Sequence, residues 1–211
     1  MCCAFGKVHT FKNFFTKRFI KIKLKFLINM TIEKTTIQDL VIINPTIFND
    51  ERGYFFEAYN QAKFHENGIT YNFIQDNQSF SRRGVIRGLH LQINPFAQAK
   101  LVRVLEGEIL DVAVDLRKNS ATYGKHFSVL LSGENKKQLM VPHGFAHGFS
   151  VLSETASVMY KVDQLYHKDS ERGIKYDDAT LNIDWQIDRN ELLVSEKDLI
   201  LPAFNDIDWE F

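Results

Sequence analysis

Between residues 70 and 163 the hydrophobic positions fall in short runs that alternate with polar positions. In residues 108–116, EILDVAVDL, the residues Leu110, Val112 and Val114 stand at every second position, and Asp111 stands between the first two. This spacing is typical of a β-strand, whose successive side chains point to opposite faces. Turn-forming residues separate the runs, which read YNFIQDN, KLVRVLEG, EILDVAVDL, HFSVLLS, KQLMVP, HGFSVLS and SVMYKV. Short strands in such close succession predict an all-β sandwich or jelly roll.

Helical periodicity is nearly absent from the same region. Residues 60–67, NQAKFHEN, are compatible with one short helix, and the strand pattern fades after about residue 164 into a mixed tail. The chain has 211 residues, of which 45% are hydrophobic, enough to bury one sizeable core. Neither a linker nor an internal repeat divides it. We therefore expect residues 30–211 to form a single all-β domain with short peripheral helices.

The first 29 residues differ in charge from the rest of the chain. They hold seven of the 26 lysines and arginines and none of the 26 acidic residues, so residues 30–211 have 26 − 7 = 19 basic residues and a net charge of about −7. An acidic domain is a poor non-specific partner for nucleic acid. The apolar runs in 1–29 are too short and too often broken by lysine to span a bilayer.

We expect residues 1–29 to be a basic extension that is disordered or that results from an upstream start, with Met30 opening the domain. The alternatives are an organellar presequence and a helix on a membrane surface. Both cysteines, Cys2 and Cys3, belong to this extension. A domain without cysteine has neither disulfides nor a thiol nucleophile, which suits the reducing cytoplasm.

Two glycine-framed motifs contain histidines that are candidates for chemistry. GVIRGLHLQ (84–92) includes His90, and VPHGFAHGF (141–149) includes His147. A metal site of the cupin type needs a second histidine two residues after the first, but Gln92 stands there, and no glutamate follows nearby. Two histidines are too few for a typical transition-metal site, which takes three or four ligands. We therefore predict that this protein binds no metal.

Two histidines and a lysine can move protons without a metal. A neutral histidine near pH 7 can take a proton from the carbon next to a ketone. A fixed cation such as Lys100 can stabilise the enolate oxygen that develops. A tyrosine, either Tyr160 or Tyr166, can return a proton from the opposite face. A base on one face and an acid on the other invert the carbon, which is epimerisation.

The longer sequence blocks resemble the dTDP-4-dehydrorhamnose 3,5-epimerase family over about residues 31–202, in the same order and at the same spacing. The blocks that carry the resemblance are DERGYFFEAYN, FIQDNQSFSRRGVIRGLHLQ, AQAKLVRVLEGEILDVAVDLRKNSATYG, LSGEN, VPHGFAHGFSVLS, YKVDQLY, ERGIKYDD and LLVSEKD. The resemblance implies a cupin-type jelly roll (a double-stranded β-sandwich or barrel) without metal or cofactor, usually a homodimer. It also implies that the chain inverts C3 and C5 of dTDP-4-dehydro-6-deoxy-D-glucose in dTDP-L-rhamnose synthesis.

The family's site residues carry over to matching positions. By this resemblance His90 is the proton-abstracting base, Asp198 orients it, Tyr160 is the proton donor and Lys100 contacts the sugar. Tyr166 is the second choice for the acid. The resemblance implies substrate contacts for a further set, comprising Arg52, Glu57, Gln75, Asn77, Arg87, His147, Glu171 and Lys197.

Two positions depart from the family pattern. Leu91 replaces a common aromatic residue, and His143 stands where a glutamate or a small residue is common. We interpret His143 and His126 as surface or turn residues. Two other functions stay open at this point: an epimerase that inverts only C3 or only C5, and a binding module with an inactive site.

Overall fold

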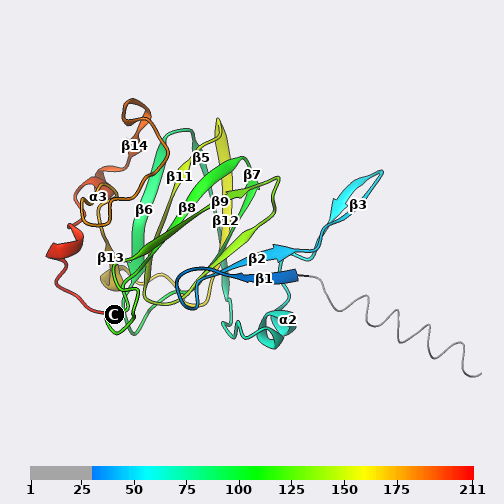
Figure 1. The fold of residues 1–211 in the computed structure, drawn as a ribbon, viewed down its shortest axis with the longest axis horizontal. Helices are drawn as coiled ribbons and strands as arrows, with labels where there is room; N and C mark the ends of the chain where they lie inside the picture. The colour runs from blue at the N-terminus through cyan, green and yellow to red at the C-terminus, as the bar shows by residue number, and fades with distance from the viewer. Residues whose placement is uncertain (1–29) are drawn as a thin grey trace, which may run out of the picture.

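The structure of the protein is a computed structural model, of which residues 30–211 are described; the basic segment 1–29 lies outside the described residues. Two β-sheets face each other in a jelly-roll sandwich, with the N-terminal strands at one edge and the C-terminal segment on the outer side of the other sheet (Figure 1). The predicted all-β, cupin-type jelly roll is confirmed.

The strand order follows from the backbone pairing within residues 30–211. The first sheet contains, in spatial order, β1 (Met30–Lys34), β2 (Val41–Pro45), β10 (Gln138–Val141), β7 (Lys100–Glu106), β12 (Thr155–Val162) and β5 (Gln75–Arg82). The second sheet contains β13 (Glu171–Gly173), β6 (Val85–Gln92), β11 (Phe145–Val151), β8 (Glu108–Asp115) and β9 (His126–Ser132), with β14 (Leu193–Val194) beside β6. Neighbouring strands are antiparallel except for β14, which runs parallel to β6. Strands β5 and β6, joined by a tight turn, therefore belong to different sheets.

Most of the predicted runs form strands close to where the sequence places them. The exception is the first run, residues 71–77, because β5 begins only at Gln75. Tyr71 and Phe73 pack instead against a small hydrophobic cluster that includes Phe64. Their aromatic side chains are thus used to attach a connecting segment to the sheet.

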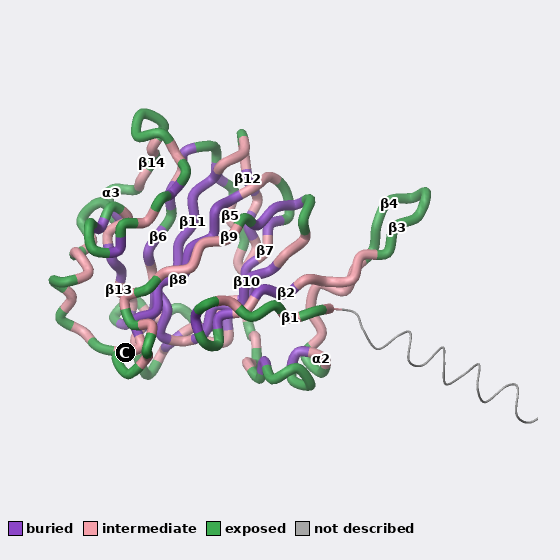
Figure 2. Tube along the Cα trace, in the orientation of Figure 1, coloured by how far each residue is buried: buried purple, intermediate pink, exposed green. Residues whose placement is uncertain are grey.

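Strand β8 is buried on both faces (Figure 2). Leu110 and Val112 face outward from the sandwich, where the C-terminal segment covers them with residues such as Trp185. Ile109 belongs to the cluster between the two sheets. Both faces of β8 are therefore buried. The alternating residues Leu110, Val112 and Val114 face the C-terminal segment rather than the space between the two sheets.

The helices are short and peripheral, as predicted. Helix α2 covers one end of the first sheet, and Asn60 caps it by accepting a hydrogen bond from the Lys63 N–H at 3.3 Å. The helices of the described residues are α2 (Gln61–Glu66), α3 (Glu196–Leu199) and the 3-10 turns η1 (Lys168–Ser170), η2 (Arg189–Glu191) and η3 (Phe204–Asp206). Within residues 30–211 none of them is long and apolar enough to span a membrane.

Two glycines allow β6 and β11 to approach closely beside the motif histidines. Gly88 has a φ of +130°, and a Cβ there would lie 2.5 Å from the Cα of Gly148. A Cβ on Gly148 would in turn lie 2.6 Å from the carbonyl oxygen of Arg87. Both positions exclude a side chain for steric reasons, so these glycines serve close backbone contact.

A two-stranded hairpin, β3 (Phe48–Asp50) and β4 (Gly53–Phe55), projects away from the sandwich (Figure 1). Its three large hydrophobic side chains are more than half exposed: Phe48, Tyr54 and Phe55 have exposed fractions of 51%, 56% and 69%. Large apolar side chains on a projecting element are typical of a surface that contacts another chain.

Candidate active site

His90 and Asp198 form a hydrogen-bonded pair at the wall of a cavity between the sheets. His90 is on β6, and its Nε2 lies 2.7 Å from Asp198 Oδ1. Asp198 is in α3, where Ser195 caps the helix by accepting a hydrogen bond from the Asp198 N–H at 3.2 Å. Burial raises the pKa of the Asp198 carboxyl, but the hydrogen bond and charge of His90, together with hydrogen bonds to Gly88 and Ser195, outweigh it and hold the pKa below its ordinary value. The carboxylate therefore stays ionised and orients the imidazole.

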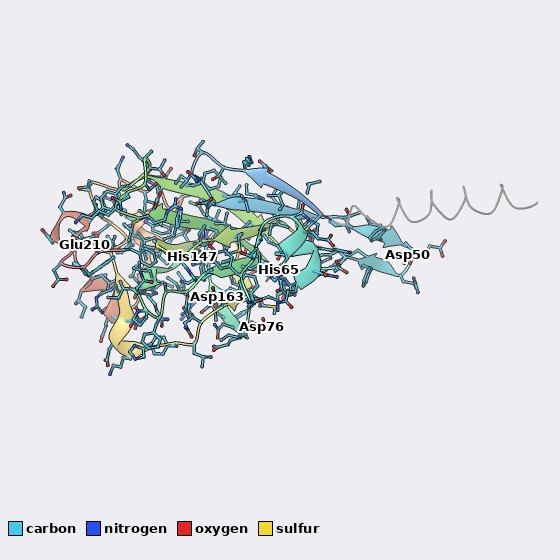
Figure 3. All side chains as sticks on the ribbon, turned by 90° about the horizontal axis from the view of Figure 1, so that it is seen from below. Asp50, His65, Asp76, His147, Asp163 and Glu210 are labelled. Carbon is cyan, nitrogen blue, oxygen red and sulfur yellow. The ribbon has the colours of Figure 1, made fainter. Side chains whose placement is uncertain are left out.

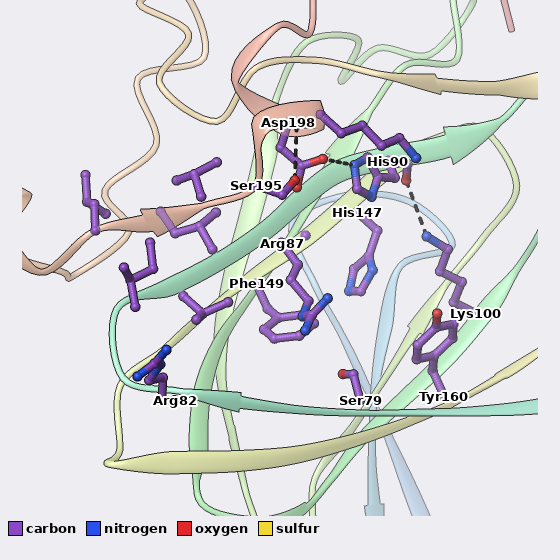
Figure 4. Close-up of a pocket in the computed structure, with 17 residues that line it drawn as sticks. Ser79, Arg82, Arg87, His90, Lys100, His147, Phe149, Tyr160, Ser195 and Asp198 are labelled. Atoms are coloured by element: carbon purple, nitrogen blue, oxygen red, sulfur yellow. Dashed lines mark hydrogen bonds and ion pairs between the residues drawn. The ribbon is translucent and has the colours of Figure 1, made fainter.

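Lys100 and Tyr160 approach the same cavity from the first sheet. They lie on the paired strands β7 and β12, and Figure 4 shows both side chains on the wall opposite His90. Lys100 Nζ donates a long hydrogen bond of 3.3 Å to the carbonyl oxygen of His90. Burial lowers the pKa of Lys100 to about 8, although Asp111 and Glu171 oppose the shift. Burial raises the pKa of Tyr160, which keeps the phenol protonated at neutral pH.

His147 forms a second histidine–carboxylate pair, deeper than the first. It pairs directly with His90 in the β11–β6 ladder. Its Nε2 lies 2.7 Å from Oδ1 of Asp111, a β8 residue, and the exposed fractions of the two side chains are 7% and 0%. Sequence reasoning missed Asp111. The available signal was a carboxylate inside the otherwise apolar strand β8.

Two adjoining cavities meet at the catalytic candidates. The larger one has a volume of about 680 Å³ and includes Arg87, His147 and Asp198 in its lining. The smaller one, of about 300 Å³, includes Gln75 and Asn77. Both are lined by the same three predicted side chains, which are His90, Lys100 and Tyr160. The shared position gives a bound molecule access to base, cation and phenol at once.

Besides His147, the structure brings five of the predicted contact residues to these cavities. Arg87 donates a hydrogen bond to Ser81 Oγ at 3.0 Å, which ties β6 to β5. Lys197 Nζ lies 2.6 Å from Glu171 Oε1 near the opening. The Gln75 amide donates a hydrogen bond to Asn77 Oδ1 at 2.7 Å.

Unlike the partly buried Tyr160, Tyr166 is exposed at the surface. Its hydroxyl donates a hydrogen bond to Glu171 Oε2 at 2.8 Å, and its ring is 59% exposed. It lines only the smaller of the two cavities. Of the two tyrosines, only Tyr160 lines both cavities.

Two predicted contact residues, Arg52 and Glu57, do not line either cavity of their own chain. Arg52 is in the turn of the β3–β4 hairpin, where it pairs with Asp50 and its side chain is 90% exposed. Figure 3 shows Asp50 at the end of the molecule far from His147. Glu57 pairs with Lys63 at 2.7 Å.

Gln92, at the position where a metal ligand would stand, is a structural residue. Its amide donates hydrogen bonds to the carbonyl oxygens of Phe96 and Leu165 at 2.6 and 3.1 Å. Its side-chain oxygen accepts one from the His167 N–H at 2.7 Å. The side chain thus joins β6 to two loops. Among residues 30–211 no group of three or more histidines, cysteines and acidic residues is arranged to hold a metal.

The interpretation of His143 as a turn residue is confirmed: it stands in the turn between β10 and β11, and its side chain is 39% exposed. His143 Nε2 lies 2.8 Å from Asp163 Oδ2, and Asp163 also accepts the Ala99 N–H at 2.7 Å. Asp163 therefore joins the end of β12 both to the turn after β10, through His143, and to the start of β7, through Ala99. His126 begins β9 and is partly buried, and this burial lowers its pKa. The local sequence did not show the partner of His143, because Asp163 is 20 residues away.

Comparison with known proteins agrees with this geometry. A family model described as dTDP-4-dehydrorhamnose 3,5-epimerase matches residues 34–206. The chain belongs to this epimerase family. A relative of that name from Shigella flexneri is 51% identical over 181 residues, which cover 85% of this chain and 99% of the relative.

Solved structures of epimerases have the same fold. The dTDP-4-dehydrorhamnose 3,5-epimerase of Elizabethkingia anophelis is 54% identical and has a TM-score of 0.83; the match covers 86% of this chain and 100% of that one. A dTDP-6-deoxy-D-glucose-3,5-epimerase of Legionella pneumophila, in complex with dTDP-4-keto-L-rhamnose, is 48% identical with a TM-score of 0.82, covering 85% of this chain and 95% of that one. The protein is thus an isomerase of the sugar-nucleotide epimerase type.

Proposed function

We propose that this epimerase converts dTDP-4-dehydro-6-deoxy-D-glucose to dTDP-4-dehydro-L-rhamnose by inverting C3 and C5, in dTDP-L-rhamnose biosynthesis. The observation that carries the proposal is an oriented histidine and a protonated tyrosine on opposite walls of one cavity, with a lysine beside both. The compound named for the complex of the Legionella relative is the product that this reaction requires.

The first half of the mechanism is proton removal by His90. Asp198 holds Nε2, so Nδ1 is the ring nitrogen free to take the proton from C3 or C5. The C–H electron pair forms a C=C bond with C4, and the C4 carbonyl oxygen becomes an enolate oxygen. The Lys100 ammonium stabilises this negative charge in a site largely closed to water.

The second half is protonation of the same carbon from the other side. Tyr160 donates its phenolic proton as the enolate collapses back to the ketone, which inverts the centre. His90 then carries the abstracted proton and Tyr160 lacks one, and solvent restores both. These two proton transfers consume no other reactant, so we propose that the enzyme uses neither cofactor nor metal.

The remaining contact residues fit a nucleotide sugar. We propose that Arg87 and Lys197 bind the diphosphate, since guanidinium and ammonium groups donate strong, charge-assisted hydrogen bonds to phosphate oxygens. We assign Gln75, Asn77 and Glu171 to polar groups of the nucleotide sugar in the smaller cavity. We also assign His147 to a sugar hydroxyl, because Asp111 leaves its Nδ1 free.

We propose a homodimer in which Arg52 and Glu57 contact the substrate of the partner subunit. The support is the projecting β3–β4 hairpin with its exposed aromatic side chains. The outer face of the first sheet near it also exposes Phe80 (65%) and Leu105 (36%). Apolar surface of this kind is typical of a subunit interface.

Subunit mixing tests this arrangement. Arg52→Ala and His90→Asn chains should each be nearly inactive alone. If Arg52 acts across the interface, a mixed dimer contains one site with both residues intact, and mixing restores activity. Mixing without recovery, although mixed dimers form, would place Arg52 in its own chain's site.

We propose a cytoplasmic enzyme with no nucleic-acid or membrane partner. The net charge of residues 30–211, about −7, disfavours nucleic acid, and these residues contain no cysteine.

Deuterium incorporation tests the reaction itself. In heavy water the enzyme should place one deuterium at C3 and one at C5 of the product. Deuterium at one carbon only would indicate a mono-epimerase, and none at either would contradict the proposed function.

A further inference from the structure

Asp111 is a buried carboxylate that the proton-transfer steps do not use. It lies on β8, facing the space between the sheets, and its side chain has an exposed fraction of 0%. One oxygen, Oδ1, lies 2.7 Å from His147 Nε2. The other, Oδ2, is buried without a hydrogen-bond partner. A buried carboxylate oxygen without a partner costs free energy, so its presence calls for an explanation.

Lys100 supplies the second half of the observation. Its ammonium group makes one long hydrogen bond, 3.3 Å to the His90 carbonyl oxygen, and no ion pair with any carboxylate of residues 30–211. Burial lowers its pKa to about 8, and the negative charge of Asp111 is the main influence that raises it again. The charge of Asp111 therefore acts on Lys100 from beyond contact distance.

This separation has a chemical advantage. A carboxylate in direct contact would occupy the ammonium N–H groups that an enolate oxygen needs. A carboxylate held a little farther away, with one oxygen facing no donor, keeps the ammonium charged and leaves its protons free. Asp111 is kept in place by the hydrogen bond with His147, whose other ring nitrogen remains available to the cavity.

We propose that Asp111 is a positioning residue with two effects: it orients His147, and its buried charge keeps Lys100 protonated while the Lys100 N–H groups stay available to the substrate oxygen. The use of these N–H groups by an enolate rests on the proposed function. The effect on Lys100 itself does not depend on turnover.

Other charged groups near Lys100 must be considered in any pH experiment. The titratable and charged groups that share the two cavities with it are Arg82, Arg87, His90, His147, Tyr160, Tyr166, Glu171, Lys197 and Asp198. Of these, Glu171 also raises the pKa of Lys100, by less than Asp111 does. Asp111→Asn removes one charge and preserves the shape of the side chain, so it isolates the effect of Asp111.

The test is the titration of Lys100 in protein carrying 13C at the lysine Cε positions, with the signal assigned by its loss in Lys100→Met. Asp111→Asn should lower the midpoint by about one pH unit or more, as expected for the loss of a nearby opposite charge. Asp178→Asn is the matched control, because Asp178 is similarly buried (4% exposed) in the C-terminal segment, where it binds backbone N–H groups. This control should leave the midpoint unchanged. If Asp111→Asn does not fold, Asp111→Ser removes the same charge with a smaller side chain.

Substrate exchange provides the second readout. We compare the deuterium exchange rate of Asp111→Asn with that of wild type at each pH. The variant rate divided by the wild-type rate should fall several-fold between about pH 6.5 and about pH 8.5, because the variant loses the Lys100 charge at a lower pH. An unchanged Lys100 midpoint would overturn the proposal whatever the enzyme does. A lowered midpoint without any wild-type exchange would instead contradict the proposed reaction and leave the assignment of Asp111 supported.

Discussion

At the scale of single residues, substitutions of His90 and Tyr160 are expected to impair the reaction in different ways. His90→Asn should lower deuterium exchange at both carbons by at least about 100-fold, since it removes the base. Tyr160→Phe keeps the ring that packs against the core and removes only the phenolic proton. Exchange should then persist while net inversion falls. Equal losses of exchange and inversion in Tyr160→Phe, measured by NMR of the product, would show that proton donation is not its separate role.

The pKa of Lys100 predicts a loss of activity at alkaline pH. Its pKa of about 8 means that the ammonium loses its proton as the pH rises through that value, so kcat/KM should decline there. Tyr160 does not cause this decline, because burial raises its pKa above the ordinary value of about 10. Deprotonation of Lys100 does not unfold the protein either. Because its pKa is lowered in the folded protein, Lys100 binds fewer protons in the folded than in the unfolded state between about pH 8 and 10.4. Its contribution to stability therefore rises with pH in that window. A pH-rate profile together with thermal melts checks both statements.

At the scale of elements, α3 controls the site through its N-cap. Ser195 accepts the Asp198 N–H, and Asp198 holds His90. Ser195→Ala should cost about 1 kcal/mol of local helix stability, which corresponds to about fivefold in the exchange rate if all of it is felt at the site. Ser195→Asn, a comparably good cap, should restore most of the rate. If both variants behave like wild type in a single-turnover exchange assay, the cap does not position Asp198.

At the scale of the whole molecule, we propose that residues 30–211 contain everything needed for folding and catalysis. The two sheets, the hydrophobic clusters and both cavities are formed within them. A protein that starts at Met30 should keep the melting temperature and turnover of the full chain. Loss of solubility, of the dimer or of activity, measured by light scattering and product analysis, would assign residues 1–29 a part in the fold or the interface.

The sequence alone determined the all-β class and the groups able to move protons. The alternation in β8 and the short spacing of the turns are local signals, and His90, Lys100 and Tyr160 stand in segments that match a family. Local sequence patterns did not show the hydrogen-bond partners of these residues. The match also brought in Asp198, 108 residues from His90, but no local pattern could show that the two side chains meet.

Only the tertiary structure decided which face of each strand is used and which residues belong to one site. It placed the apolar half of β8 beneath the C-terminal segment and brought Asp111 into contact with His147. It also separated Arg52 and Glu57 from the cavity of their own chain. The physical reason is the same in each case: strand periodicity fixes that two faces exist, whereas the packing of distant segments decides what each face meets.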